Sequence, residues 1–133
     1  PLVTVVLKEN AHIGHGAVIH GAIIGKNCLV GMNAVIMDNV YLGDECIVGA
    51  LSFIKAEERI PTRSMLVGNP AKIIKQVSDE MIAWKTEGTK IYKQLAAEMQ
   101  NEWKACKPLR DILEQKIDSN KNYKKWNETK AIN

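Results

Sequence analysis

The feature that most constrains this chain is a run of large aliphatic residues spaced six positions apart. The run is Leu7, Ile13, Ile19, Ile24, Val30, Ile36, Leu42, Val48 and Ile54, with a single step of five among steps of six. An α-helix repeats every 3.6 residues and a strand every two, so neither explains this period. A six-residue repeat is typical of a parallel β-helix, whose coils each have three short faces. We therefore predict a mainly β fold with about three coils.

Taking every third member of the run gives three columns, one for each face of the prism. The columns are Leu7/Ile24/Leu42, Ile13/Val30/Val48 and Ile19/Ile36/Ile54. The aliphatic side chains fill the bore, and small residues fit where the chain turns a corner. This arrangement stacks Ala34 on Ser52, and Cys28 on Cys46.

Cys28 and Cys46 lie one full coil apart, which leaves two readings. Their Cα atoms could come within disulfide range, or both could be small buried apolar side chains. We favour the second reading, because three cysteines do not make a small disulfide scaffold. The sequence has few cysteines and needs none of them as a disulfide, which is typical of a protein in the reducing cytoplasm.

The second half of the sequence predicts a helix. Ser78 is a candidate N-cap with Asp79 and Glu80 in the first turn. A stripe of apolar residues follows at helical spacing: Met81, Trp84, Gly88, Ile91, Leu95, Met99 and Trp103. Pro61 and the run 67–72 are expected to close the coils before this helix. We thus expect the β-helix over 1–77, a helical segment over 78–117 with a short second helix from 109, and a partly disordered tail over 118–133.

Charge and hydropathy exclude two classes of partner. Lysine and arginine outnumber aspartate and glutamate by 18 to 15, a net charge of +3. A dedicated nucleic-acid binder carries a sharper and more clustered excess. The sequence also has no run near the roughly 18 apolar residues of a membrane span. We expect a small-molecule substrate, with neither nucleic acid nor membrane as partner.

All three histidines fall within nine residues, at His12, His15 and His20. Imidazoles clustered in this way suggest ligands for Zn²⁺ or a similar metal. His15 and His20 would be about 16 Å apart on a straight strand, pointing to opposite faces. Either a corner brings them together, or each metal takes His15 from one chain and His20 from another. The second arrangement requires an oligomer with threefold or similar symmetry.

Two segments and a closing turn resemble the γ-class carbonic anhydrase family. They are Gly14–Gly21, Val30–Asp38 and Val67–Lys72, and the likeness extends over about residues 3–110. The match is nearer to the branch that contains the phenylacetate-degradation protein PaaY and the carnitine-operon protein CaiE. Ala83-Trp84-Lys85 and the helix through Tyr92 also resemble that branch. The closing turn is shared with many hexapeptide acyltransferases and discriminates little.

The resemblance implies a homotrimer of left-handed β-helices with a metal at each subunit interface. The metal is zinc, with iron or cobalt as alternatives, and three histidines from two chains bind it. His15 matches the ligand donated across the interface, and His20 matches a ligand of the other subunit. The family's first histidine lies more than one coil upstream, where this chain has none, so we expect an N-terminally truncated member. His12 is a candidate replacement, although its spacing matches no family position.

Three classes of function stay open. The first is hydration of CO₂ by a metal-activated hydroxide, weak in this chain because a ligand is missing. The second is chemistry on a CoA thioester, as a hydrolase or a hexapeptide acyltransferase of phenylacetate or carnitine metabolism. The third is a non-catalytic trimeric accessory protein. No catalytic residue beyond the metal ligands is assigned.

Overall fold

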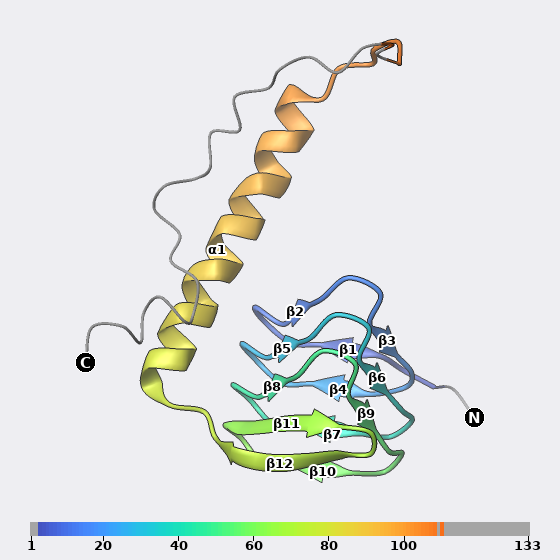
Figure 1. Ribbon diagram of the computed structural model, residues 1–133, viewed down its shortest axis with the longest axis vertical. Helices are drawn as coiled ribbons and strands as arrows, with labels where there is room; N and C mark the ends of the chain where they lie inside the picture. The colour runs from blue at the N-terminus through green and yellow to red at the C-terminus, as the bar shows by residue number, and fades with distance from the viewer. Residues whose placement is uncertain (1–2, 109, 111–133) are drawn as a thin grey trace. The chain divides into compact units, whose positions relative to one another are not determined.

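The computed structural model describes residues 3–108 and residue 110, and its first part is a parallel β-helix, as predicted (Figure 1). Strands of two residues form the coils. They are β1 (Val6–Leu7), β2 (His12–Ile13), β3 (Val18–Ile19), β4 (Ile23–Ile24), β5 (Leu29–Val30), β6 (Val35–Ile36), β7 (Tyr41–Leu42), β8 (Ile47–Val48), β9 (Phe53–Ile54) and β10 (Arg59–Ile60). Each six-residue repeat supplies one strand and the corner that follows it.

The strands of the described residues pair into three sheets, one for each face of the prism. Their orders are β1-β4-β7-β10, β12-β11-β8-β5-β2 and β3-β6-β9. The parallel registers pair the members of the predicted columns with one another, coil by coil. The columns and the number of coils, about three, are therefore confirmed.

The corners turn through residues in the left-handed region. Several corners use asparagine, which adopts this conformation more readily than most residues. The non-glycine positions, with φ between 52° and 67°, are Asn10, Asn27, Asn33, Asn39, Glu45, Leu51, Glu57 and Arg63. Backbone bonds between coils hold these corners together; the Asn33 amide, for example, donates to the His15 carbonyl at 2.9 Å. The corners thus stack in register with the strands.

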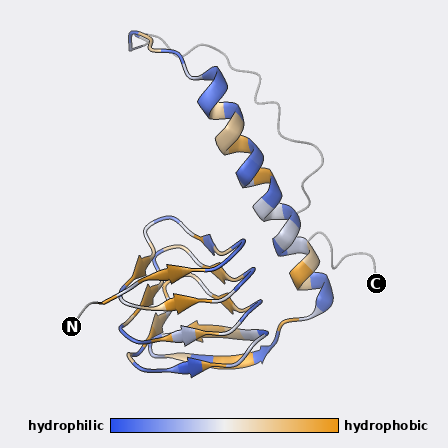
Figure 2. Cartoon of the chain, turned by 180° about the vertical axis from the view of Figure 1, so that it is seen from behind, coloured by the Kyte–Doolittle hydropathy of each residue, from blue (hydrophilic) through white to orange (hydrophobic). Residues whose placement is uncertain are grey.

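The bore of the prism is the hydrophobic core. Hydropathy is highest along the strands of the coils and lower at the corners (Figure 2). The fully buried side chains include the aliphatic columns from Ile24 onward and the predicted small residues Cys28, Cys46 and Ser52. In the first coil Ile13 and Ile19 are partly buried and Leu7 is exposed. The coils approach so closely that a Cβ on Gly25 would lie 2.5 Å from the backbone of Gly43. Only glycine fits at such a corner.

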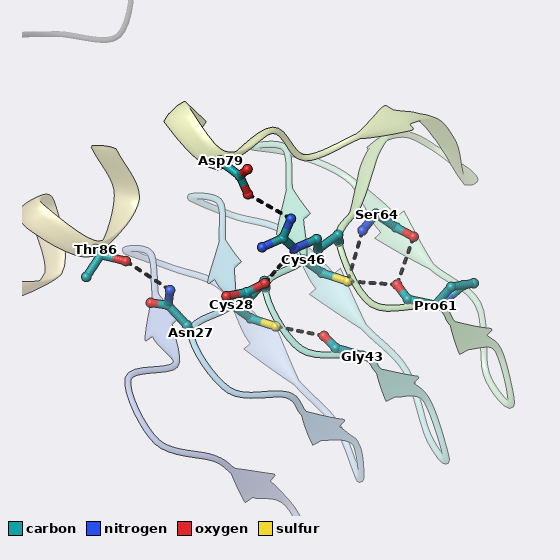
Figure 3. A network of polar contacts seen from close by, with 10 residues as sticks. Asn27, Cys28, Gly43, Cys46, Pro61, Ser64, Asp79 and Thr86 are labelled. Atoms are coloured by element: carbon teal, nitrogen blue, oxygen red, sulfur yellow. Dashed lines mark hydrogen bonds and ion pairs between the residues drawn. The ribbon is translucent and has the colours of Figure 1, made fainter. Parts of the chain in front are cut away.

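Both cysteine thiols are buried and free, as predicted. Cys28 donates to the Gly43 carbonyl at 3.0 Å, and Cys46 donates to the Pro61 carbonyl at 3.1 Å (Figure 3). The neighbouring Cys46 sulfur and burial raise the pKa of the Cys28 thiol. Cys28 is therefore a neutral thiol that stabilises the corner below it.

The coils end in an antiparallel hairpin. β11 (Ser64–Gly68) pairs in parallel with β8 on one side and antiparallel with β12 (Ala71–Gln76) on the other. A cis peptide joins Asn69 to Pro70 in the turn between them. Pro61 does not stop the ladder as expected, because β11 pairs again three residues later. β12 is the strand that covers the edge.

The predicted helix is α1 (Asp79–Glu102), and Ser78 is its N-cap. The Met81 amide donates to the Ser78 hydroxyl at 3.3 Å. A hydrogen bond with Ser78 also lowers the pKa of Glu80 in the first turn. Residues 103–108 have no regular structure, and the second helix and tail expected after 108 lie outside the described residues apart from Arg110.

The chain divides into two compact units, residues 1–89 and 90–133, so the first turns of α1 belong to the β-helix unit. Lys85 is buried there, and its ammonium donates to the Asn10 carbonyl at 2.7 Å and to Asn27 Oδ1 at 2.6 Å. The Asn27 amide donates to the Thr86 hydroxyl at 2.9 Å (Figure 3). Polar contacts with two stacked corners therefore hold the start of the helix. No helix among the described residues has the length and apolar character to cross a membrane.

Candidate functional site

His20 lies at the corner between β3 and β4, and its ring is held by a carboxylate from the coil below. Its Nδ1 is 2.7 Å from Asp38 Oδ1, with 62% of the His20 side chain exposed. An ionised carboxylate can only accept a hydrogen bond, so Nδ1 carries the proton that is donated. The lone pair of Nε2 is then left for another ligand. This carboxylate–imidazole arrangement is typical of histidines that bind metals.

Asp38 is the residue that the sequence interpretation missed. It lies 18 positions after His20, close to the 17-residue step that separates paired strands in this coil. That offset was the available signal, because it places Asp38 one coil below His20. Gly21 leaves room for the contact, since a Cβ there would lie 2.7 Å from Asp38 Oδ1.

His15 lies at the preceding corner, between β2 and β3, and is exposed. Its backbone carbonyl accepts the corner bond from Asn33, while its side chain lies on the outside of the coil. His15 and His20 are thus on consecutive corners, as the repeat predicts.

His12 faces the start of α1. Its Nδ1 is 3.2 Å from the Thr89 hydroxyl, which itself donates to the Lys85 carbonyl at 3.1 Å. Because that hydroxyl proton is already used, His12 Nδ1 is the donor to Thr89. Burial, and to a lesser extent the charges of Lys85 and His15, lower the pKa of His12. His12 is therefore a neutral, half-buried imidazole at neutral pH.

The three histidines do not converge on one point within a single chain. Across residues 3–108 and 110, no group of three histidine, cysteine or acidic side chains is placed to hold a metal ion. The donor chemistry of His20 nevertheless fits a metal ligand, because Asp38 fixes its ring and leaves Nε2 open. A metal at His20 would need its other protein ligands from a second copy of the chain.

A cavity of about 440 Å³ lies beside this pair. Asp38 and Gly21 line it at the level of His20, and Arg59 lines it from β10. Val3 and Ile23 give it apolar walls, whereas the Val40 side chain is buried in the bore. This corner therefore places the oriented His20 imidazole beside a cavity that is lined by the Arg59 guanidinium and by apolar side chains.

Comparison with known proteins supports the repeat. Residues 21–56 match the family described as bacterial transferase hexapeptide (six repeats). Over 109 residues the chain is 45% identical to the carnitine operon protein CaiE of Salmonella agona strain SL483 and to that of Escherichia coli strain K12. These alignments cover 82% of this chain, and 55% and 56% of the two relatives. The chain thus spans little more than half the length of the curated relatives that it matches.

Solved structures share the fold. A Bacillus cereus protein described as a candidate acetyltransferase has a TM-score of 0.71 at 25% identity, covering 73% of this chain and 56% of its own. The serine acetyltransferase of Neisseria gonorrhoeae has a TM-score of 0.54 at 29% identity, covering 57% and 32%. The six-residue repeat and the stacked coils show a hexapeptide-repeat fold, and the chain is similar to CaiE proteins over most of its length.

Proposed function

We propose that this chain forms a homotrimer that binds Zn²⁺, or iron or cobalt in its place, between neighbouring copies and hydrates CO₂. The observation that carries the proposal is the bond between His20 Nδ1 and Asp38, which orients the ring and leaves Nε2 as a ligand. When bound, the metal supplies Lewis acidity that lowers the pKa of water to about 7. His20 of one copy and His15 of the next would hold the ion.

The outer surface between these two corners supports an interface. Val18, Met32 and Leu51 are large apolar side chains with 49%, 55% and 73% of their surface exposed. Val18 lies on β3, and Met32 and Leu51 lie at the corners stacked one and two coils below the corner of His15. A second copy of the chain on this surface would cover these three side chains and bring its own histidines close to those of the first copy.

His12 is our candidate for the third protein ligand. It is neutral at neutral pH because its pKa is lowered, and a neutral imidazole is the form that binds metals. Its Nδ1 is occupied by Thr89, so Nε2 would be the coordinating atom. A site with only two protein ligands would bind the metal more weakly.

Metal analysis of the purified protein tests the proposal directly. We expect zinc, iron or cobalt in the trimer, and loss of that metal with an intact trimer in His15→Ala and His20→Ala. The trimer should persist because the aliphatic columns stabilise the coils and both imidazoles lie outside the bore. Full metal content in either variant would refute the ligand assignment, and stopped-flow CO₂ hydration then measures the activity of the loaded protein.

A second candidate is chemistry on a CoA thioester, as a hydrolase or an acyltransferase. The likeness to a serine acetyltransferase and the cavity beside His20 favour it. Release of free thiol from acetyl-CoA, without acceptor and then with serine, distinguishes hydrolysis from transfer. A trimer that is inactive in both assays and in CO₂ hydration would support the third reading, an accessory protein.

A further inference from the structure

The cavity beside Asp38 contains a guanidinium that is available for a ligand. The ion pairs of the described residues join His20 to Asp38, Lys55 to Glu58, and Arg63 to two carboxylates, so none involves Arg59. The Arg59 guanidinium lies 5.8 Å from the centre of the Tyr41 ring. This cation–π contact orients the group without neutralising it.

Tyr41 supports Arg59 from the same face of the prism. The register pairs Arg59 with Tyr41 and Tyr41 with Ile23, so the three side chains form one outward column across neighbouring coils. Lys8 adds a second cation on the Tyr41 ring, at 5.2 Å from its centre. The positive charge of this column lies beside a cavity whose carboxylate, Asp38, is already bonded to His20.

An arginine with a planar fork of donors favours a carboxylate or phosphate oxygen pair. Asn39 provides a further amide donor at the same cavity. Val3 and Ile23 would contact the apolar part of a ligand. These side chains together suit a ligand with one anionic end and a short hydrocarbon chain.

The volume of the cavity admits anions larger than bicarbonate. At about 30 Å³ for each water molecule, 440 Å³ corresponds to about fifteen waters. Bicarbonate has four non-hydrogen atoms and would leave most of that space, and the apolar walls, without contact. An organic carboxylate of several carbons would fill more of it.

We infer that this cavity is a subsite for a short aliphatic carboxylate, held by Arg59 and Asn39 with its hydrocarbon chain on Val3 and Ile23. The assignment rests on the second candidate function given above, because it identifies the anion that a thioester hydrolase acting at His20 would release.

Binding of butyrate to the purified full chain tests this inference. We expect butyrate to shift the amide resonances of Gly21 and Asn39 in ¹H–¹⁵N spectra, and 1-butanol and bicarbonate to bind at least tenfold more weakly. Arg59→Gln should weaken butyrate at least tenfold, and Arg59→Lys should weaken it less. Lys55→Gln is the matched control, because Lys55 is a nearby cation that pairs with Glu58 and does not line the cavity.

Equal binding of butyrate to the wild-type protein and to Arg59→Gln would overturn the inference, as would equal binding of bicarbonate. The comparison of three ligands uses the wild-type protein, so it decides the question even if a variant fails to fold. Titration of metal-free protein separates this subsite from the proposed metal. Butyrate binding without any metal uptake refutes only the metal proposal, and metal uptake without butyrate binding refutes only the subsite.

Discussion

At the residue scale, Asp38 determines how His20 presents its ring. The carboxylate accepts from Nδ1, so the neutral ring presents Nε2 to a ligand. We predict that Asp38→Asn weakens zinc binding about 10- to 100-fold, the usual effect of losing such a partner. Competition with a coloured zinc chelator measures this affinity. Asp44→Asn is the control, since Asp44 caps the Lys26 amide at a different corner, and an equal loss there would contradict the role of Asp38.

The cysteine pair gives a second prediction at this scale. Both thiols donate to backbone carbonyls, which a disulfide could not do. Alkylation under denaturing, non-reducing conditions should therefore label Cys28 and Cys46 completely, as read by mass spectrometry. A peptide pair linked through these two residues would show that the stacking is wrong.

His12 predicts a pH dependence of stability. Its pKa is lowered in the folded protein from an unfolded value near 6.5, so the unfolded chain binds the extra proton first. The contribution of neutral His12 to stability is therefore fully present above about pH 6.5 and is lost as the pH falls from there through the pKa of the folded state. The groups that disfavour the charged ring, besides burial, are Lys85 and His15, and Thr89 is its hydrogen-bond partner.

Thermal unfolding of the wild-type protein and of His12→Gln between pH 5 and 7.5 measures this effect. We expect the wild-type melting temperature to fall more steeply below pH 6.5 than that of the variant. Parallel curves for the two proteins would show that His12 is not responsible.

At the element scale, the coils could be predicted from the sequence and the placement of polar side chains could not. The period of six fixes which residues enter the bore, so the columns and the stacking of Cys28 on Cys46 follow from spacing alone. The hydrogen bond between Asp38 and His20 depends on the orientation of side chains outside the bore. The burial of Lys85 depends on it as well. No periodic pattern encodes those directions, and the cavity at Arg59 arises only when several coils are stacked.

Lys85 is the residue through which the start of α1 contacts the β-helix. Its ammonium donates to the Asn10 carbonyl and to Asn27 Oδ1, which lie at two corners stacked one coil apart. Lys85→Met keeps most of the volume but leaves both acceptors without this donor. We predict a loss of about 2–3 kcal/mol in the free energy of unfolding, from charged hydrogen bonds that are buried. Urea unfolding measures it, and the exposed Lys72→Met should change stability by less than about 0.5 kcal/mol.

Hydrogen exchange shows where that loss occurs. Amides of residues 79–89 should exchange faster in Lys85→Met, while those of β5 and β8 stay protected. Uniform acceleration across the coils would mean that Lys85 supports the whole unit instead of the helix start.

At the scale of the whole molecule, the proposed site needs more than one chain. His15 and His20 lie on consecutive corners of the same prism, so a single copy presents them to different neighbours. We predict a trimer at micromolar concentration by sedimentation velocity. Charging the exposed apolar surface with Leu51→Glu should shift the protein toward monomer, whereas Glu57→Gln at another corner should not. A wild-type monomer of 14.8 kDa would exclude the interfacial site.

The in-register stacking of the corners also governs which changes of length this chain can tolerate. Paired strands are separated by 17 or 18 residues, as in Ile13 with Val30 and Val30 with Val48. Corners can differ in length by one residue, since the step of five between Ile19 and Ile24 leaves the later columns in the bore. Deleting a residue from one of the two-residue strands would instead turn the side chains of that repeat out of the bore. Deleting a complete coil of 18 residues would leave all the remaining pairs intact. Length variation in such a chain is thus confined to the corners and to whole coils, and a site built across two coils, like that of His20 and Asp38, depends on both coils being present.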